Sequence, residues 1–156
     1  MRTLILLLSF CCAACTTEPN ESLRTVLVSF EAPVTDGDIA ALRAVGGSIQ
    51  HRLDLARAVS LRTGIPAASY RSVTGVRSAE DLGEADNPMV SVFVETDGPP
   101  VTADSTFIAS LDAEFIFMDP EHQVIAAVMP LGRVEDLESR RRFIEIDVYP
   151  EAPRTQ

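Results

Sequence analysis

Two periodicities in the apolar residues organise the chain from residue 24 onward. Val26, Val28 and Phe30 alternate with their neighbours, and β-branched residues dominate, which predicts a strand with one better-buried face. Positions 39–45 then carry apolar residues at helical spacing, and the Gly-Gly pair that follows predicts the end of that helix. Further strands are predicted at 48–54, 56–62 and 76–80, with a short helix at 66–72.

The second half of the chain repeats this order of elements. Strands are predicted at 90–94, 114–118, 123–129 and 143–148, with helices beginning at Thr102 and covering 134–141. Each half therefore reads β-α-β-β-α-β. The predicted fold class is α+β, with two tandem ferredoxin-like units, each an antiparallel four-stranded sheet carrying two helices on one face.

An internal duplication is predicted from the alignment of the two halves. After the first strand, an offset of 67 residues pairs Pro33 with Pro100 and Leu61 with Val128. The first strand aligns better at 64, which predicts about three extra loop residues near Asp97 in the second copy. Chance similarity between two units of the same fold is the alternative.

The amino terminus has the pattern of an export signal. All three cysteines of the chain lie at Cys11, Cys12 and Cys15, behind a short positive start and an apolar run too short to span a bilayer. A small-residue pair before Cys15 resembles a bacterial lipobox, although Cys12 stands where that pattern usually has leucine. The resemblance implies a signal peptide at 1–14, diacylglycerol on Cys15 and an acylated, palmitate-bearing amino terminus. A linker is expected at 15–23. Ordinary secretion is the alternative.

Composition and charge exclude several classes of function. The full chain has a net charge of −10, and removal of residues 1–14 leaves 12 Arg against 23 acidic residues, or −11. An acidic chain without a basic patch does not bind nucleic acid, because phosphate neutralisation needs clustered cations. The only basic run, Arg140 to Arg142, is expected to be the solvated last turn of a helix.

Catalytic and metal-binding patterns are absent from the sequence. His51 and His122 are the only histidines, no serine lies in a nucleophile elbow, and no Gly-rich phosphate loop follows a strand. Metal ligation is not expected at the cysteines, because a zinc site needs four ligands and the nearest histidine is far along the chain. We therefore expect no enzyme activity, no cofactor and no metal.

Four stretches of the first half together resemble the peptidase inhibitor I9 domain, the propeptide domain of subtilisin-like serine proteases. These stretches are 26–30, 44–49, 58–61 and 75–81, and the resemblance covers about 24–86. The second copy, about 88–150, matches by topology and spacing, but Asp112-Ala113 replaces the Gly-Gly pair. The resemblance implies that the chain binds a protease of this class.

The resemblance also implies which residues touch the protease. In the family, acids on the closing strand face the amino termini of two protease helices, and the extended segment that follows lies in the active-site cleft. Residues 148–156 are expected to form such a free tail, with 151–156 flexible. The implied contact residues in the two copies are Glu80, Asp81, Glu145, Asp147, Val148, Tyr149 and Pro150.

The expected function follows from the export signal and the resemblance. The chain carries no catalytic domain after the inhibitor-like units, so we expect a lipoprotein that binds a subtilisin-like protease in trans, as inhibitor or folding helper. We expect it to be exported and anchored by lipid to a bacterial membrane, the outer membrane where there is one. Two alternatives stay open: a non-inhibitory interaction module of the cell envelope, and a small-ligand sensor with paired ferredoxin-like domains.

Overall fold

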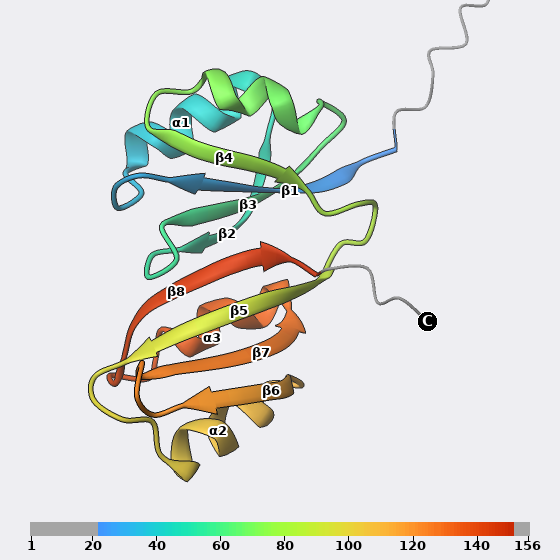
Figure 1. Cartoon of the computed structure of the whole chain (residues 1–156). Helices are drawn as coiled ribbons and strands as arrows, with labels where there is room; N and C mark the ends of the chain where they lie inside the picture. Colours follow the sequence, from blue (N-terminus) through green and yellow to red (C-terminus); the bar gives the residue numbers. More distant parts are fainter. Residues whose placement is uncertain (1–21, 152–156) are drawn as a thin grey trace, which may run out of the picture.

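The computed structural model describes residues 22–151, which form two four-stranded antiparallel sheets with helices packed against each (Figure 1). The predicted α+β class is confirmed, and all eight predicted strands are present. The first unit runs β1 (Arg24–Phe30), α1 (Asp36–Val45), β2 (Ser48–Leu53), β3 (Ala58–Thr63), the 3-10 helix η1 (Ala67–Ser72) and β4 (Val76–Asp81). The second runs β5 (Met89–Thr96), α2 (Thr102–Ala109), β6 (Glu114–Asp119), β7 (Val124–Pro130), the 3-10 helix η2 (Leu131–Arg133), α3 (Val134–Leu137) and β8 (Phe143–Pro150).

The two sheets have the same strand order. Sheet A is ordered β2-β3-β1-β4 and sheet B is ordered β6-β7-β5-β8, with every neighbouring pair antiparallel. This order is compatible with the predicted two-unit ferredoxin-like arrangement. One face of each sheet is apolar and packs against that unit's own helices, because alternate strand residues point to the same face.

The start of α1 shows how the sequence sets an element boundary. The Thr35 hydroxyl accepts a hydrogen bond from the Asp38 amide, while the Asp38 carboxylate accepts one from the Thr35 amide at 2.8 Å. The helix ends at Gly46, whose φ of 109° is open to glycine at little cost. Between these caps, Leu42 is fully buried against Val28 and the other core residues of sheet A.

Two predicted helices are shorter or tighter than expected. The helix predicted at 66–72 is the 3-10 helix η1, and the helix predicted at 134–141 ends with α3 at Leu137. The prediction that the Arg140–Arg142 run is the solvated last turn of a helix is wrong, because the helix ends before all three residues and two of the side chains are engaged within the protein. Arg140 and Arg142 both reach the buried carboxylate of Asp104, and this tertiary pairing replaces the last turn of helix.

The strand registers correct the predicted repeat alignment. Ile49 faces Leu61 in sheet A, and Phe115 faces Ala127 in sheet B, so both members of the pair are 66 residues apart (49 to 115, 61 to 127). The same offset relates β1 to β5, so the predicted offsets of 67 and 64 are wrong there, and no extra loop residues are needed near Asp97. Only β4 and β8 are related by 67, so the second copy gains one residue between its third and fourth strands.

Backbone conformation supports the corrected alignment independently. Left-handed residues recur 66 positions apart: Gly46 and Asp112 follow the two helices, and Arg57 and Gln123 sit in the two hairpin turns. The one-residue correction matters because a slip of one residue along a strand moves every side chain to the other face. Leu61 is a core residue of sheet A, and its partner by repeat is the core residue Ala127.

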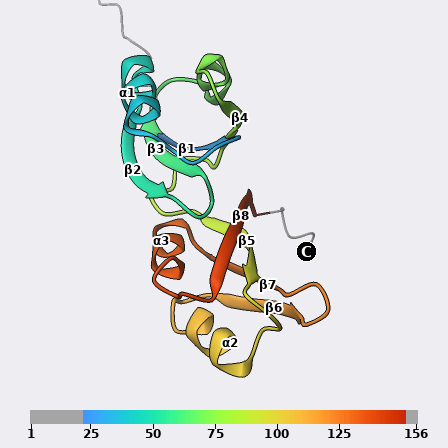
Figure 2. The ribbon, with the colours of Figure 1, turned by 90° about the vertical axis from the view of Figure 1, so that its left-hand side faces the viewer.

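The outer face of sheet A, away from its own helices, is covered by the second unit. Leu27, Leu53 and Ala58 on this face belong to the same apolar cluster as the core of sheet B. The Glu138 carboxylate accepts a hydrogen bond from the Leu55 amide at 2.8 Å, and Arg57 pairs with Glu145 at 2.7 Å. Figures 1 and 2 show the β2–β3 hairpin of sheet A lying over β8.

Candidate functional site

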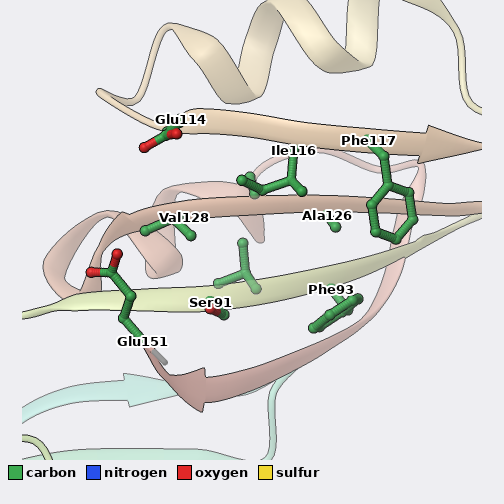
Figure 3. A pocket seen from close by; sticks show the side chains of 10 residues that line it. Ser91, Phe93, Glu114, Ile116, Phe117, Ala126, Val128 and Glu151 are labelled. Carbon is green, nitrogen blue, oxygen red and sulfur yellow. The ribbon is translucent and has the colours of Figure 1, made fainter. Parts of the chain in front are cut away.

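The outer face of sheet B is the open counterpart of the covered face of sheet A. In β5, Val90, Val92 and Val94 point into the core, so Ser91 and Phe93 point to the outer face. A hollow of about 430 Å³ lies on this face (Figure 3). The side chains that line it are those of Ser91, Phe93, Glu114, Ile116, Phe117, Ala126, Val128 and Glu151.

Three aromatic rings, from Phe93, Phe117 and Tyr149, dominate the open face, and we call them the aromatic trio. The Phe93 ring centroid lies 6.4 Å from that of Phe117 and 5.9 Å from that of Tyr149, both in edge-on geometry. Their side chains are 38%, 44% and 45% exposed, respectively. Exposed apolar groups gathered in this way are typical of binding surfaces, because their exposure to water is unfavourable.

The covered outer face of sheet A carries polar side chains at positions where the open outer face of sheet B carries apolar ones. By the 66-residue offset, Ser60 corresponds to Ala126 and Arg62 to Val128, so the covered face carries a hydroxyl and a guanidinium where the open face carries aliphatic groups. Arg62 donates to the Glu84 carbonyl oxygen at 2.8 Å within the covered region. The open face is thus the more apolar of the two, although it has no covering segment among residues 22–151.

Two of the residues implied by the resemblance lie on this open face. Asp147 and Tyr149 border a second, shallower hollow with Phe93 and Val124, on the outer side of β8. Asp147 lies 4.0 Å from Arg77, and its side chain is about half exposed. The structure therefore places a carboxylate beside the aromatic trio.

The other implied residues of the second copy are engaged within the protein. Glu145 pairs with Arg57 across the junction of the units, and Val148 packs against the core of sheet B. The prediction that a free tail begins at Val148 is wrong, since Val148, Tyr149 and Pro150 belong to β8 and pair with β5. Their pairing follows from the alternation of Ile146 and Val148, which continues the buried face of the strand.

In the first copy, the two acidic residues implied by the resemblance lie close to other parts of the described chain. Glu80 stands opposite Leu27 in sheet A, on the face that the second unit covers. Asp81 pairs with Arg24 at 2.6 Å and accepts a hydrogen bond from the Gly83 amide. Burial alone would raise the pKa of Asp81, but these two partners hold it below the ordinary value.

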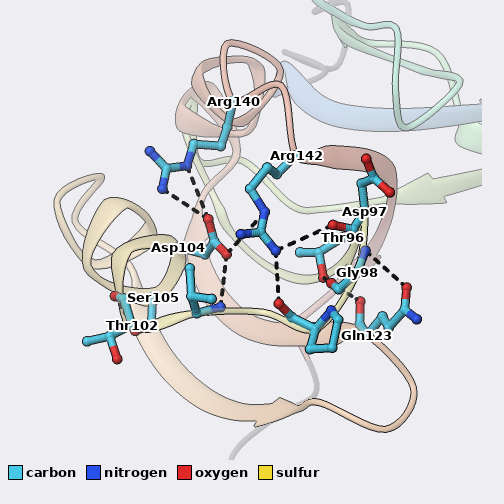
Figure 4. A network of polar contacts seen from close by, with 11 residues as sticks. Thr96, Asp97, Gly98, Thr102, Asp104, Ser105, Gln123, Arg140 and Arg142 are labelled. Carbon is cyan, nitrogen blue, oxygen red and sulfur yellow. Dashed lines mark hydrogen bonds and ion pairs between the residues drawn. The ribbon is translucent and has the colours of Figure 1, made fainter.

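The buried carboxylate of Asp104 links α2 to the turn before β8 (Figure 4). Asp104 is fully buried, accepts a hydrogen bond from the Val101 amide at 3.0 Å, and pairs with Arg140 at 3.0 Å and Arg142 at 3.8 Å. Burial raises the pKa of Asp104, but the amide and the two guanidinium groups outweigh it and lower the pKa overall. This network is structural, since it joins α2 to the turn before β8.

The expectations for the amino terminus and the carboxy-terminal tail concern residues outside the part of the chain that the structure describes. Cys15 and the predicted signal peptide lie outside the described residues, as do residues 152–156. Among residues 22–151, no cluster of three or more histidine, cysteine or acidic side chains could hold a metal ion. Within the same residues, no helix is long and apolar enough to cross a membrane.

Tyr149 of the aromatic trio was among the residues implied by the resemblance, but Phe93 and Phe117 were missed in the sequence, although two signals point to them. Phe93 interrupts the valines of β5 at the position that alternation assigns to the outer face, and the run of Phe115 to Phe117 shows no alternation at all.

Comparison with models of known protein families found no match, and no curated protein matched the chain.

Proposed function

We propose that this chain is a protein-binding module in which two ferredoxin-like units act together and the open face of sheet B docks a folded partner. The observation that carries the proposal is the aromatic trio on the one outer sheet face that the rest of the described chain leaves open. The partner class is a subtilisin-like serine protease, as the resemblance of the first copy to the inhibitor I9 domain implies.

The aromatic trio has the properties of a docking centre. Covering the exposed parts of three rings would contribute on the order of 5 kcal/mol before the costs of association. Aromatic residues lose few rotamers on binding and commonly carry most of an interface's energy. The hollow beside Phe93 and Phe117 gives a partner side chain a place to insert.

The neighbouring carboxylate supports a partner that presents helix amino termini. Asp147 stands opposite Phe93 in the sheet, at the edge of the aromatic trio. A helix amino terminus carries unpaired amides and a partial positive charge, so a carboxylate facing it is stabilising. A sheet that combines apolar contacts with this carboxylate suits the helix pair that inhibitor I9 domains cover.

The first unit supports the second and sets its distance from the membrane. Its own outer face packs through Leu27, Leu53 and Ala58 against the second unit, so it offers no equivalent docking surface. Export and lipidation at Cys15 are part of the same proposal and place the module at a bacterial membrane.

Non-inhibitory binding is the second candidate function. It is favoured by the strand pairing of Val148, Tyr149 and Pro150 with β5, because a segment entering a protease cleft would begin only after these residues. Under this candidate the open face docks a different envelope protein. A ligand sensor is less favoured, since Leu27, Leu53 and Ala58 fill the junction between the units with apolar side chains.

The test is a binding and inhibition assay on several subtilisin-like proteases with residues 16–156, a fragment that contains every described residue. We expect binding that Phe93→Glu weakens by at least about thirtyfold, because it places a charge in the centre of the interface. Ile144→Glu is the matched control, since Ile144 is exposed to a similar extent but lies outside the aromatic trio. Absence of binding to every protease would leave the second candidate in its place.

A further inference from the structure

Within residues 22–151, strand β6 forms one edge of sheet B and pairs only with β7. An edge strand presents backbone N–H and C=O groups on its outer side, which can hydrogen-bond to an added strand. Natural edge strands are usually protected by charged side chains, by proline or by a covering segment. In the part of the chain that the structure describes, none of these protections is found at the centre of β6, where the sequence reads Phe115-Ile116-Phe117.

The three central side chains of β6 are unusually exposed for large apolar residues. Phe115, Ile116 and Phe117 are 41%, 51% and 44% exposed. Phe117 faces Ala126 on the open face, Phe115 faces Ala127, and Ile116 sits at a one-residue bulge between them. Ile116 and Phe117 also line the hollow of about 430 Å³, so the edge of the sheet and the hollow are continuous (Figure 3).

The first unit supplies an internal control for this edge. The equivalent strand β2 is also an edge strand and has its bulge at the same place, between Ile49 and His51. Yet the bulged residue there is Gln50, and the following residues are His51 and Arg52, whose guanidinium pairs with Asp36 and Asp54. The backbone is shared, so the apolar centre is a property of β6 and not a requirement of the fold.

The charges at the ends of β6 select the kind of strand that can pair with it. Glu114 opens the strand and Asp119 closes it. Hydrogen bonds from His122 lower the pKa of Asp119, so this carboxylate is ionised at neutral pH. A second copy of β6, paired antiparallel about its centre, would set Glu114 opposite Asp119 at both ends, and like charges facing each other are destabilising.

We propose that β6 binds an extended segment of a partner protein by strand addition, with apolar residues along the centre of the segment and arginine or lysine at both ends. The backbone of the segment pairs with the outer edge of β6, and its basic ends meet Glu114 and Asp119. Side chains on the outer face of the segment enter the hollow beside Ile116 and Phe117. This site adjoins the aromatic trio and shares Phe117 and the hollow with it, but its backbone pairing uses the outer edge of β6 and does not depend on the partner's being a protease.

The probe is a pair of displayed peptide libraries with five randomised central positions. One library has arginine at both ends of the randomised stretch, and the other has glutamate. We expect residues 16–156 to enrich peptides from the arginine library, with alternating apolar residues, and not from the glutamate library. Equal enrichment from both libraries, or from neither, would overturn the proposal.

N-methylation of the selected peptide distinguishes binding by strand addition from binding by side-chain contacts alone. Alternate backbone amides of an added strand point toward β6, so N-methylation of these amides should weaken binding at least tenfold. N-methylation of the other alternate amides should have little effect. A peptide that tolerates both patterns equally is not bound as a strand, and the proposal would fail.

Two matched variants locate the site. Ile116→Lys adds the charge that protects natural edges and should remove peptide binding, while Gln50→Lys, at the same bulge in β2, should leave it unchanged. Tyr149→Glu alters the aromatic trio at a residue that borders the second hollow and not the one beside Ile116, so it should retain peptide binding while weakening the folded partner, and the two proposals fail separately. A dimer in light scattering that Ile116→Lys converts to a monomer would instead assign the edge to a second copy of the chain and overturn the proposal.

Discussion

Gln50 and Ile116 occupy the same one-residue bulge in the outer strands of the two sheets, 66 residues apart (50 to 116). The backbone around them is alike, yet one side chain is polar and the other is a half-exposed aliphatic group. The same contrast separates Arg62 from Val128 on the neighbouring strands. The two units therefore share a fold while their outer surfaces differ in chemistry, which supports our proposal that only the outer face of the second unit docks a partner.

Ser60→Ala should stabilise the protein. The Ser60 hydroxyl is fully buried on the covered face without a hydrogen-bond partner, and its repeat equivalent is already alanine, at Ala126. Removal of a buried hydroxyl that has no partner should raise the free energy of unfolding by about 1 kcal/mol. Urea denaturation measures the change.

Thr63→Val is the matched control for that substitution. The Thr63 hydroxyl is equally buried, but it accepts hydrogen bonds from the Tyr70 hydroxyl at 2.7 Å and the Ile65 amide at 2.9 Å. Its loss should lower the free energy of unfolding by about 1–2 kcal/mol. If both variants shift stability in the same direction, the hydroxyl of Ser60 is not unsatisfied in solution.

Asp104→Asn should destabilise the second unit. It leaves Arg140 and Arg142 without their anionic partner, and because both guanidinium groups are partly exposed we expect a loss of about 2 kcal/mol. Asp38→Asn, 66 residues earlier at the same capping position, alters a carboxylate that is only partly buried and has no arginine partner among residues 22–151, and should cost less than about 1 kcal/mol. Similar losses in the two variants would contradict the structural role of the buried network.

The pH dependence of the Asp104 contribution follows from its lowered pKa. A carboxyl group with a lower pKa in the folded than in the unfolded state stabilises the fold above the unfolded value of 3.8. This contribution is lost as the pH falls through the folded pKa. The stability difference between the wild type and Asp104→Asn should therefore shrink below pH 3.8, as thermal unfolding at several pH values would show.

Glu138 should show the opposite pH dependence at the junction of the units. Burial raises the pKa of Glu138, and the nearby Asp54 and Glu135 raise it further, against the Leu55 amide, which lowers it. The folded state thus binds this proton more tightly than the unfolded state, so ionisation of Glu138 weakens the fold as the pH rises above 4.5. Glu138→Gln keeps an acceptor for Leu55 and should be more stable than the wild type at pH 7 but not below pH 4.5. A constant difference across that range would contradict this.

The end of β8 sets where the chain can be shortened. Truncation after Asp147 removes Val148 from the core and Tyr149 from its contact with Phe93, and should lower the free energy of unfolding by about 2 kcal/mol or more. Truncation after Glu151 keeps the whole strand and should leave the melting temperature unchanged. Any test of residues 152–156 in binding should use the second truncation, because loss of binding by the first would report unfolding.

Much of the fold could be predicted because its signals are local. The alternation of Val26, Val28 and Phe30 and the cap at Thr35 specify their elements without help from the rest of the chain. The register of the repeat could not be predicted to one residue, since few side chains are identical between the copies. The strand pairings of Leu61 and Ala127, together with the recurring left-handed residues, show which residues correspond.

The candidate site could not be predicted in the same way, because long-range contacts decide which sheet face is covered and no local sequence pattern reveals those contacts. In the sequence, acids on the two closing strands look alike, yet Glu80 lies on the covered face and Asp147 beside the open aromatic trio. The covering of sheet A by the second unit decides this difference. The contacts responsible, such as Leu55 with Glu138, join residues far apart in the chain.

Photocrosslinking at the aromatic trio tests the central claim most directly. A photoreactive amino acid is placed at position 93 or, as the control, at position 144 in the full chain, and the cells that make the protein are irradiated. Our account predicts that position 93 captures one predominant protein and that position 144 does not, and mass spectrometry of the captured band then shows whether it is a subtilisin-like protease. Equal capture at both positions, or no capture at position 93 while the chain is folded and exported, would contradict the assignment of the open face of sheet B as a docking surface.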